Sequence, residues 1–173
     1  MFVFYGDTAN GKTALMNMMI VVLQNNLYIR SARILCDRRM TNGVIRDLKN
    51  KRMCLMNDAS AKDIIKEDIV GKFTTDVEEE CAKHNIVPYF KMVSETNHYP
   101  VTTITNHDPK IKNRVEIVPF KAHFVQNPIS PDERKINKDK IEELRGHLNE
   151  FFVWLVKGSI EYYKNGLPPL PGN

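Results

Sequence analysis

The sequence predicts an α/β fold in which helices flank a central parallel sheet, and three observations support this class. The aromatic and β-branched run 2–5 predicts a buried strand that ends at Gly6. Residues 11–24 follow directly, are rich in Leu, Met, Ile and Val, and predict a helix buried on most sides. The apolar run 53–56 is closed by Asn57-Asp58, which predicts a central strand with an acid at its carboxyl end. Strands that alternate with helices are typical of α/β domains.

Apolar periodicity and turn residues assign the other elements of the first part of the chain. Ser60 and Asp63 have the spacing of an N-cap pair, so we expect a helix over about 61–72. The interval 73–88 is expected to be irregular or hairpin-like. Extended segments are predicted at 27–36, 89–94 and 115–118, and polar stretches at 37–51 and 101–113.

The C-terminal part of the chain is predicted to be helical. The segment 130–133, Ser-Pro-Asp-Glu, has capping-box spacing with proline at the first helical position. Gly166 is expected to end the helix. Because no polar linker precedes this part, 1–173 is expected to be one domain, with 1–128 as its α/β core and 129–173 as its helical part. The apolar residues that recur at helical spacing are Ile141, Leu144, Leu148, Phe151, Leu155 and Tyr162.

Composition limits the classes of protein that fit. The chain has 173 residues, of which 42% are hydrophobic, and its net charge of +4 allows a polyanion partner without requiring one. Cys36, Cys54 and Cys81 lack CxxC spacing, which argues against a disulfide framework and against a zinc site. We expect reduced thiols in an intracellular, reducing compartment. Since no run approaches the ~20 apolar residues of a membrane span, no membrane partner is expected.

The strongest functional signal is the pattern G-x-x-x-x-G-K-T between the first strand and the first helix. Glycines in this context let the backbone wrap a phosphate, and the helix N-terminus adds the positive end of its dipole. Lys12 is expected to reach the β- and γ-phosphates and Thr13 to ligate Mg²⁺, so ATP and Mg²⁺ are the expected cofactors. The loop consists of Gly6, Asp7, Thr8, Ala9, Asn10, Gly11, Lys12 and Thr13.

A phosphate loop of this kind needs a second acid that holds Mg²⁺ and orients water. Asp58 ends an apolar strand, where such an acid belongs, although it could instead cap the following helix. Asp37 is a weaker rival because it ends a less apolar segment. Asn97 follows another predicted strand, so its amide could touch the γ-phosphate or the attacking water; taken alone it is a turn residue. Arg114, at the start of the next strand, reads on its own as a surface charge.

The asparagine directly before Gly11-Lys12-Thr13 is typical of superfamily 3 helicases, the AAA+-like motors of DNA viruses and of some phages and plasmids. The rest of the chain resembles one branch of them, the primase-helicases of poxviruses, other large DNA viruses and related phages. The resemblance covers nearly the whole chain in order, and the ordered set is more specific than the loop alone. The segments that carry it are 48–56 before Asp58, 90–93, Thr96-Asn97-His98-Tyr99-Pro100, 114–120 with Phe124, and 154–168.

This resemblance implies an AAA+-like ATPase that assembles into a homo-oligomeric ring, expected to be a hexamer. In it Asn97 takes the sensor role, and Arg114 acts as an arginine finger on the ATP of the neighbouring subunit. The superfamily also places a hairpin between the second acid and the sensor, with its tip in the central channel. Lys83-His84 is the basic pair in that interval, so it is expected to contact single-stranded DNA; the alternative is an ordinary solvated loop.

The sequence therefore predicts an ATP-dependent DNA helicase motor that moves along single-stranded DNA in viral or phage-type replication, in the host cytoplasm or nucleus if viral. Primase and other replication proteins are its further expected partners. Two departures concern hydrolysis: no arginine follows Thr75-Asp76, and one arginine stands at Asn113-Arg114 where relatives often have two. The alternatives are an ATP-binding ring module without turnover and a small P-loop kinase. Candidates for the arginine-rich lid of such a kinase are Arg30, Arg33, Arg38 and Arg39.

Overall fold

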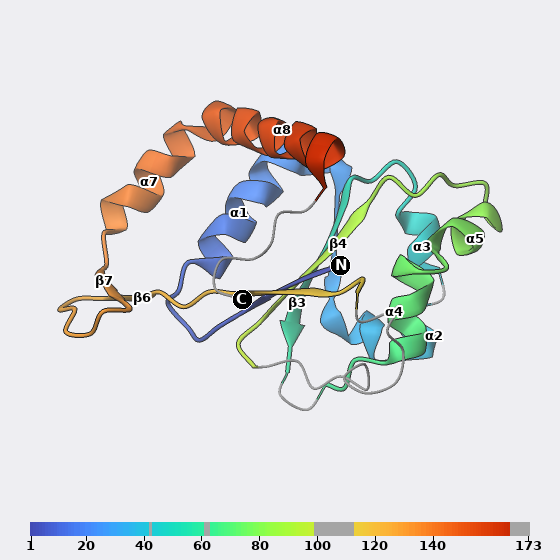
Figure 1. Cartoon of the computed structure of the whole chain (residues 1–173), viewed down its shortest axis with the longest axis horizontal. Helices are drawn as coiled ribbons and strands as arrows, with labels where there is room; N and C mark the ends of the chain where they lie inside the picture. The colour runs from blue at the N-terminus through green and yellow to red at the C-terminus, as the bar shows by residue number, and fades with distance from the viewer. Residues whose placement is uncertain (42, 61–62, 99–112, 167–173) are drawn as a thin grey trace.

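The computed structural model describes residues 1–41, 43–60, 63–98 and 113–166, with the backbone alone at 58, 59, 138 and 141. At its centre lies a five-stranded parallel sheet in the order β2-β3-β4-β1-β5 (Figure 1). Helices cover the sheet, so the predicted α/β class is confirmed. The strands are β1 (Phe2–Tyr5), β2 (Leu27–Ser31), β3 (Met53–Ala59), β4 (Lys91–Thr96) and β5 (Glu116–Pro119).

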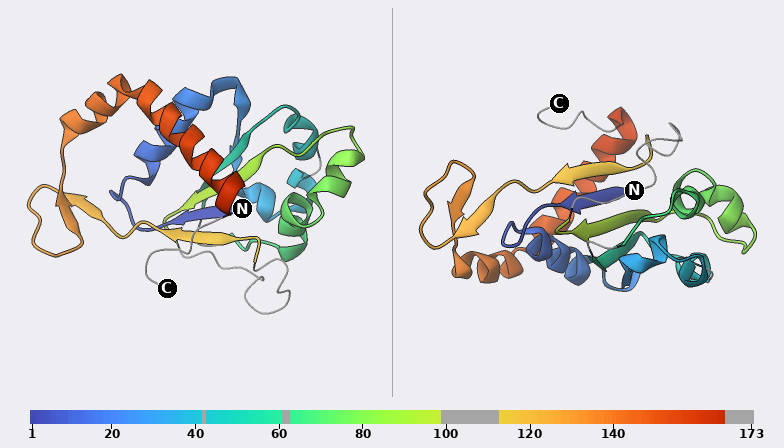
Figure 2. Two further views of the ribbon diagram at one scale, coloured as in Figure 1. Left: turned by 45° about the horizontal axis from the view of Figure 1, so that its top comes forward. Right: turned by 90° about the horizontal axis from the view of Figure 1, so that it is seen from below.

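Helices pack on both faces of this sheet (Figure 2). One face is covered by α1 (Lys12–Leu23) and α8 (Leu148–Asn165), and the other by short helices that include α4 (Glu67–Thr74) and α5 (Val77–Ala82). The remaining elements are the 3-10 turns η1 (Gln24–Asn26) and η2 (Ala32–Leu35), the helices α2 (Arg38–Thr41), α3 (Val44–Asp47) and α7 (Lys138–Gly146), and the paired strands β6 (His123–Val125) and β7 (Glu133–Lys135).

The central strands are buried on both faces because their side chains alternate between two apolar clusters. On β3, Cys54 and Met56 belong to the cluster under η2, α3, α4 and α5, whereas Leu55 belongs to the cluster under α1. Met92 and Val93 of β4 divide in the same way. A strand buried on both faces reads as a continuous apolar run, which is why 53–56 could be predicted as a central strand.

The helix expected over about 61–72 begins later, at Glu67. The Ser60 N–H does donate to the Asp63 carboxylate at 2.8 Å, so the capping signal describes a real local turn. The chain does not continue from it into the helix, because the Lys66 N–H donates to the Leu35 carbonyl oxygen at 2.9 Å. This tertiary bond holds Lys66 in extended backbone, and α4 begins at the next residue.

The hairpin expected within 73–88 is wrong, because residues 77–82 form helix α5. Three successive glutamates occupy its first turn, where they complement the positive end of the helix dipole. Val77 and Cys81 lie one turn apart and pack into the core, which anchors the helix. The polar loop expected at 101–113 lies outside the described residues except for Asn113.

The tail is helical as expected, but its first helix begins beyond the predicted capping box. The Glu133 carboxylate accepts hydrogen bonds from the N–H groups of Ile129 and Ser130, at 2.6 and 3.1 Å, so half of that box forms. The chain then enters β7, and α7 begins after Asn137, whose side chain accepts from Asp139 and Lys140. His147 separates α7 from α8, and Gly166 ends α8 with a positive φ of 77°.

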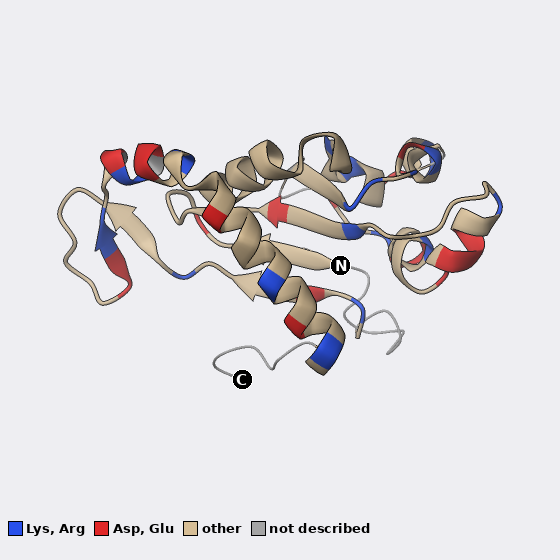
Figure 3. Cartoon of the chain, turned by 90° about the horizontal axis from the view of Figure 1, so that it is seen from above, with Lys and Arg blue, Asp and Glu red and all other residues tan. Residues whose placement is uncertain are grey.

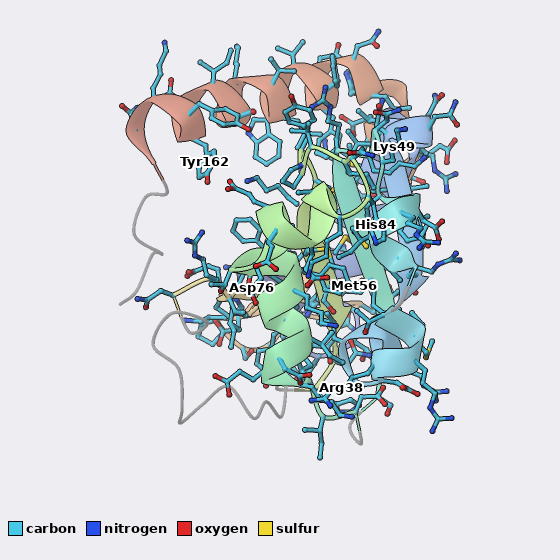
Figure 4. All side chains as sticks on the ribbon, turned by 90° about the vertical axis from the view of Figure 1, so that its right-hand side faces the viewer. Arg38, Lys49, Met56, Asp76, His84 and Tyr162 are labelled. Carbon is cyan, nitrogen blue, oxygen red and sulfur yellow. The ribbon has the colours of Figure 1, made fainter. Side chains whose placement is uncertain are left out.

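Helix α8 packs one side on the domain and exposes a second apolar side. Most of its length is uncharged, as the tan ribbon of Figure 3 shows. Phe151 lies against the cluster under α1, and the Tyr162 ring lies 5.5 Å from the Lys91 ammonium (Figure 4). The exposed side carries large apolar residues at helical spacing: Phe152, Val153, Val156, Ile160 and Tyr163. Within the described ranges, none of the helices is long and apolar enough to span a membrane.

Candidate phosphate-binding site

The loop 6–13 leaves the carboxyl end of β1 and enters α1 directly. β1 lies inside the sheet, between β4 and the outermost strand β5, so the loop sits at the carboxyl end of an interior strand. The Gly6 N–H donates to the Thr96 carbonyl oxygen at 3.3 Å, which ties the start of the loop to the end of β4. In open α/β sheets, ligands bind at this edge, beside the strand where the order reverses.

Backbone conformation explains the two glycines of the loop. Gly6 and Gly11 have φ values of 152° and 89°, and Ala9 between them has 57°. A Cβ on Gly6 would stand 2.5 Å from the Phe120 carbonyl oxygen and would also collide with the Asn10 side-chain amide. Gly6 is therefore required by space as well as by its φ, since backbone atoms cannot move aside as a flexible side chain can.

Lys12 is buried within the loop, with 4% of its surface exposed. Its ammonium donates to the carbonyl oxygens of Gly6 and Asp7, at 2.5 and 2.9 Å, and to Asn10 Oδ1 at 3.1 Å. Burial lowers the pKa of Lys12, while the nearby carboxylates of Glu95 and Asp7 act in the opposite direction. The loop thus holds one buried cation on three acceptor oxygens, and this ammonium is a donor that fits the oxygens of a phosphate group.

Asn10 links the loop to both of its neighbours. Its Oδ1 accepts from the Lys12 N–H at 3.3 Å as well as from the Lys12 ammonium, so it stabilises the first turn of α1. Its Nδ2 donates to the Phe120 carbonyl oxygen at 3.3 Å. An asparagine at this position therefore has a structural reason, since one side chain supplies both the acceptor and the donor.

The segment 120–124, which we call the strap, runs from β5 across the outer side of the loop. The Phe120 N–H donates to the Tyr5 carbonyl oxygen at 2.7 Å, and the Phe120 ring packs on Phe4 with centroids 5.2 Å apart. Further along, the Phe124 N–H donates to the Ala9 carbonyl oxygen at 2.8 Å. His123 Nε2 lies 3.5 Å from an Asp7 carboxylate oxygen. Together with the Asn10 bond, these contacts fix the outer wall of the loop.

Asp58 and Asn97 lie at the same edge of the sheet as the loop. Asp58 is the second-last residue of β3, and the register pairs the last residue, Ala59, with Thr96 of β4. Thr96 in turn pairs with Tyr5, the residue before Gly6. Asn97 follows β4 with its side chain exposed, so the backbones of Asp58, Asn97 and Gly6 end neighbouring strands.

Two further residues near this edge were considered from the sequence. Thr13 lies exposed on the first turn of α1, and its magnesium role stays a prediction. Asp37, the rival second acid, accepts the Arg39 N–H at 2.8 Å and so caps the start of α2. A local capping role accounts for Asp37 without a ligand, which favours Asp58.

Arg114 lies at the amino ends of the strands, whereas the loop of the same chain lies at their carboxyl ends. Its carbonyl oxygen accepts from the Met1 ammonium at 2.7 Å, at the amino ends of β1 and β5. Residues 114 to 119 span about 16 Å at ~3.3 Å per residue along a strand. The Arg114 side chain is exposed, so any role at an ATP site would be at the site of another subunit.

Lys83 and His84 follow α5, beside the amino ends of the strands and away from the loop (Figures 1 and 4). The Lys83 ammonium lies 2.7 Å from Glu80 and 3.3 Å from Glu79, and the hydrogen bond to Glu80 raises the pKa of Lys83. Since the interval is a helix and not a hairpin, nothing extends the pair towards a channel. Contact of Lys83 and His84 with DNA stays a prediction, without the structural feature that suggested it.

Two parts of the site were missed from the sequence. The strap is one, because its contacts join residues more than a hundred positions apart and no local pattern marks them. Glu95 is the other: it lies on β4, in register with Phe4, and its charge acts on Lys12. An acid directly after the predicted strand 89–94 was the available signal for Glu95.

Comparisons with known proteins agree with this fold and give a distant relationship. No protein-family model matches the chain. Primase D5 of Fowlpox virus (strain NVSL) is 24% identical over 164 residues, covering 86% of this chain and 19% of the viral protein. The A form apo structure of the NrS-1 C-terminal region superposes with a TM-score of 0.50 at 12% identity, over 85% of this chain and 34% of that one. The chain thus spans about a fifth of the length of the viral relative, and it is a distant homologue of that viral replication protein. The α/β fold of the chain is compatible with that of P-loop NTPases.

Proposed function

We propose that the chain is the ATP-hydrolysing motor of a DNA helicase that acts in viral or phage-type replication. The observation that carries this proposal is the loop itself, in which the buried Lys12 directly follows the second of two positive-φ glycines, at the carboxyl end of the interior strand β1. The resemblance to primase-helicases and the distant relationship to Primase D5 support the replication role.

Within this proposal each residue at the edge has a separate task. Lys12 exchanges its bonds to loop carbonyl oxygens for the β- and γ-phosphate oxygens of ATP. Thr13 and Asp58 hold Mg²⁺, which neutralises phosphate charge when it is bound. Asn97 orients the attacking water from the end of β4. The loop and α1 supply inward N–H groups and the helix dipole, and these need no rearrangement during the reaction.

The ring is part of the same proposal. Arg114 lies at the edge away from its own loop, which fits an arginine supplied to a neighbouring subunit. The exposed apolar side of α8 offers a surface that a second copy of the chain could cover. A ring of this kind would translocate on single-stranded DNA and would work with a primase and other replication proteins.

The loop and the acid are tested by steady-state ATPase assays with and without single-stranded DNA. Lys12→Ala should lower turnover roughly 10²- to 10³-fold, as loss of a main electrostatic contact does, and Asp58→Asn should keep ATP binding but stop hydrolysis. Lys49→Ala, at an exposed lysine, is the matched control. Wild-type turnover by Asp58→Asn would reassign the acid to Asp37. Phosphate transfer to nucleosides would support the kinase alternative, and ATP binding without turnover the inert module.

Arg114 is tested by mixing two variants. Lys12→Ala subunits keep Arg114, and Arg114→Ala subunits keep the loop, so each should be nearly inactive alone. An arginine finger is worth ~10³–10⁵ in rate in P-loop enzymes, so mixed rings should regain measurable activity at interfaces that combine both intact parts. Light scattering checks that both variants assemble. Assembled mixtures that stay inactive would show that Arg114 does not act in trans.

A further inference from the structure

If the chain binds ATP as in the proposed function, the strand order determines on which side of the loop the nucleoside lies. The transferred phosphate must lie near Asp58 and Asn97, which end β3 and β4. Both strands lie on one side of β1, and β5 lies on the other. The nucleoside must therefore extend from the loop away from β4, towards the side of β5 and the strap.

An exposed aromatic ring already stands on that side. Phe124 Cε2 lies 3.6 Å from the position of a Cβ built on Gly11, so the ring flanks the second glycine of the loop. The Phe124 N–H donates a hydrogen bond to the Ala9 carbonyl oxygen, which fixes the backbone of Phe124 to the loop. The residue is nevertheless 38% exposed.

Packing within the domain does not account for this ring. Phe120, the other aromatic of the strap, packs at a tilt on Phe4 next to the core. Phe124 belongs to neither apolar cluster formed by the described residues. An aromatic face that is rigidly attached to a phosphate loop, yet left accessible, fits the flat surface of a nucleobase.

We propose that Phe124 is the platform on which the base of the bound nucleotide stacks, and that His123 positions the loop through Asp7. Stacking uses the π-face that every base has, so this contact adds affinity with little selection between adenine and guanine. It also separates two parts of the site: the loop binds the triphosphate, and the strap binds the nucleoside.

Binding of Mg²⁺-ATP and of Mg²⁺-tripolyphosphate to the full chain, measured by isothermal calorimetry, tests the proposal. Phe124→Ala should weaken ATP and GTP alike, roughly 5- to 150-fold, the range for loss of one base–aromatic stack, and should leave tripolyphosphate within about twofold. Phe124→Tyr should restore ATP affinity, whereas Phe124→Leu, which keeps apolar volume, should not. Phe120→Ala, which removes a ring that braces the strap, should weaken both ligands equally.

Three outcomes would overturn the assignment. Equal loss of ATP and tripolyphosphate in Phe124→Ala would make Phe124 a brace of the loop, and full affinity in Phe124→Leu would make it an apolar filler. Unchanged ATP affinity in Phe124→Ala would remove it from the site. Wild-type protein that binds neither ligand would contradict the proposed function itself. If wild-type protein binds both ligands, the results for the Phe124 variants test the role of Phe124 alone.

Discussion

Replacement of Gly6 by alanine should destabilise the fold by an amount that the structure allows to be divided into two parts. The positive φ of 152° lies in a region that L-residues sparsely populate and costs about 1–3 kcal/mol. The added Cβ would meet the Phe120 carbonyl oxygen at 2.5 Å, and forced overpacking of this kind costs about 1–3 kcal/mol. Together these give a loss of about 2–6 kcal/mol in the free energy of unfolding.

Two other glycines separate the two contributions. Gly43 has a φ of 97° with nothing within 4 Å of its Cβ position, so Gly43→Ala should show the conformational part alone, about 1–2 kcal/mol. Gly11, with φ 89° and an ordinary 3.6 Å contact to Phe124, should resemble Gly43. Equilibrium urea unfolding gives all three values, provided that the m-value stays constant. If Gly6→Ala loses no more stability than Gly43→Ala, the strap does not crowd the loop and the close contact to Phe120 is not real.

Three further predictions concern residues outside the site. Burial raises the pKa of all three thiols, that of Cys54 to about 12. A thiol reagent at pH 8 should therefore label half-buried Cys36 first and reach Cys54 and Cys81 only on unfolding. Rapid labelling of Cys54 in the folded protein would contradict its burial. Burial and the hydrogen bond to Asp47 raise the pKa of Tyr28 to about 12. The stability that the neutral Tyr28 hydroxyl contributes should therefore be present below pH 10 and lost between pH 10 and 12. Tyr28→Phe should remove that part of the pH dependence of the urea midpoint. Gly158 lies within α8 with open space around it, so Gly158→Ala should raise stability by about 0.5–1 kcal/mol, and a loss measured by thermal melting would mean that the position is packed.

The parts of the site that could be predicted from sequence are those encoded locally. The loop is a contiguous pattern, and its two glycines and buried lysine are required by the geometry of eight neighbouring residues. Asp58 closes an apolar strand and Asn97 follows another strand, and parallel strands bring their carboxyl ends to one edge, so their shared location followed from the fold class.

The parts that failed depend on contacts between distant segments. The Ser60–Asp63 turn exists, but the bond from Lys66 to Leu35 delays the helix, and no local signal announces that bond. The strap is another such case, since Asn10 and Phe120 meet only after the sheet has formed. For helix α5 a local signal existed, since Val77 and Cys81 have helical spacing, but irregular or hairpin-like structure was expected over 73–88, and the family resemblance also implied a hairpin.

The position of β1 inside the sheet has a consequence for how the chain folds. Phe2 of β1 pairs with Val93 on one side and with Glu116 on the other, so both partners of β1 are translated well after it. Contacts between residues this distant in sequence require long loops to close, and the chain loses conformational entropy on closure before the contacts add stability. This order of events slows folding. During synthesis β1 emerges with both of its edges unpaired, and the loop that follows it gains its outer wall only when Phe120 and Phe124 have left the ribosome. β1 and the loop are therefore translated before the segments that complete them, and they reach their native structure only after those segments have been made.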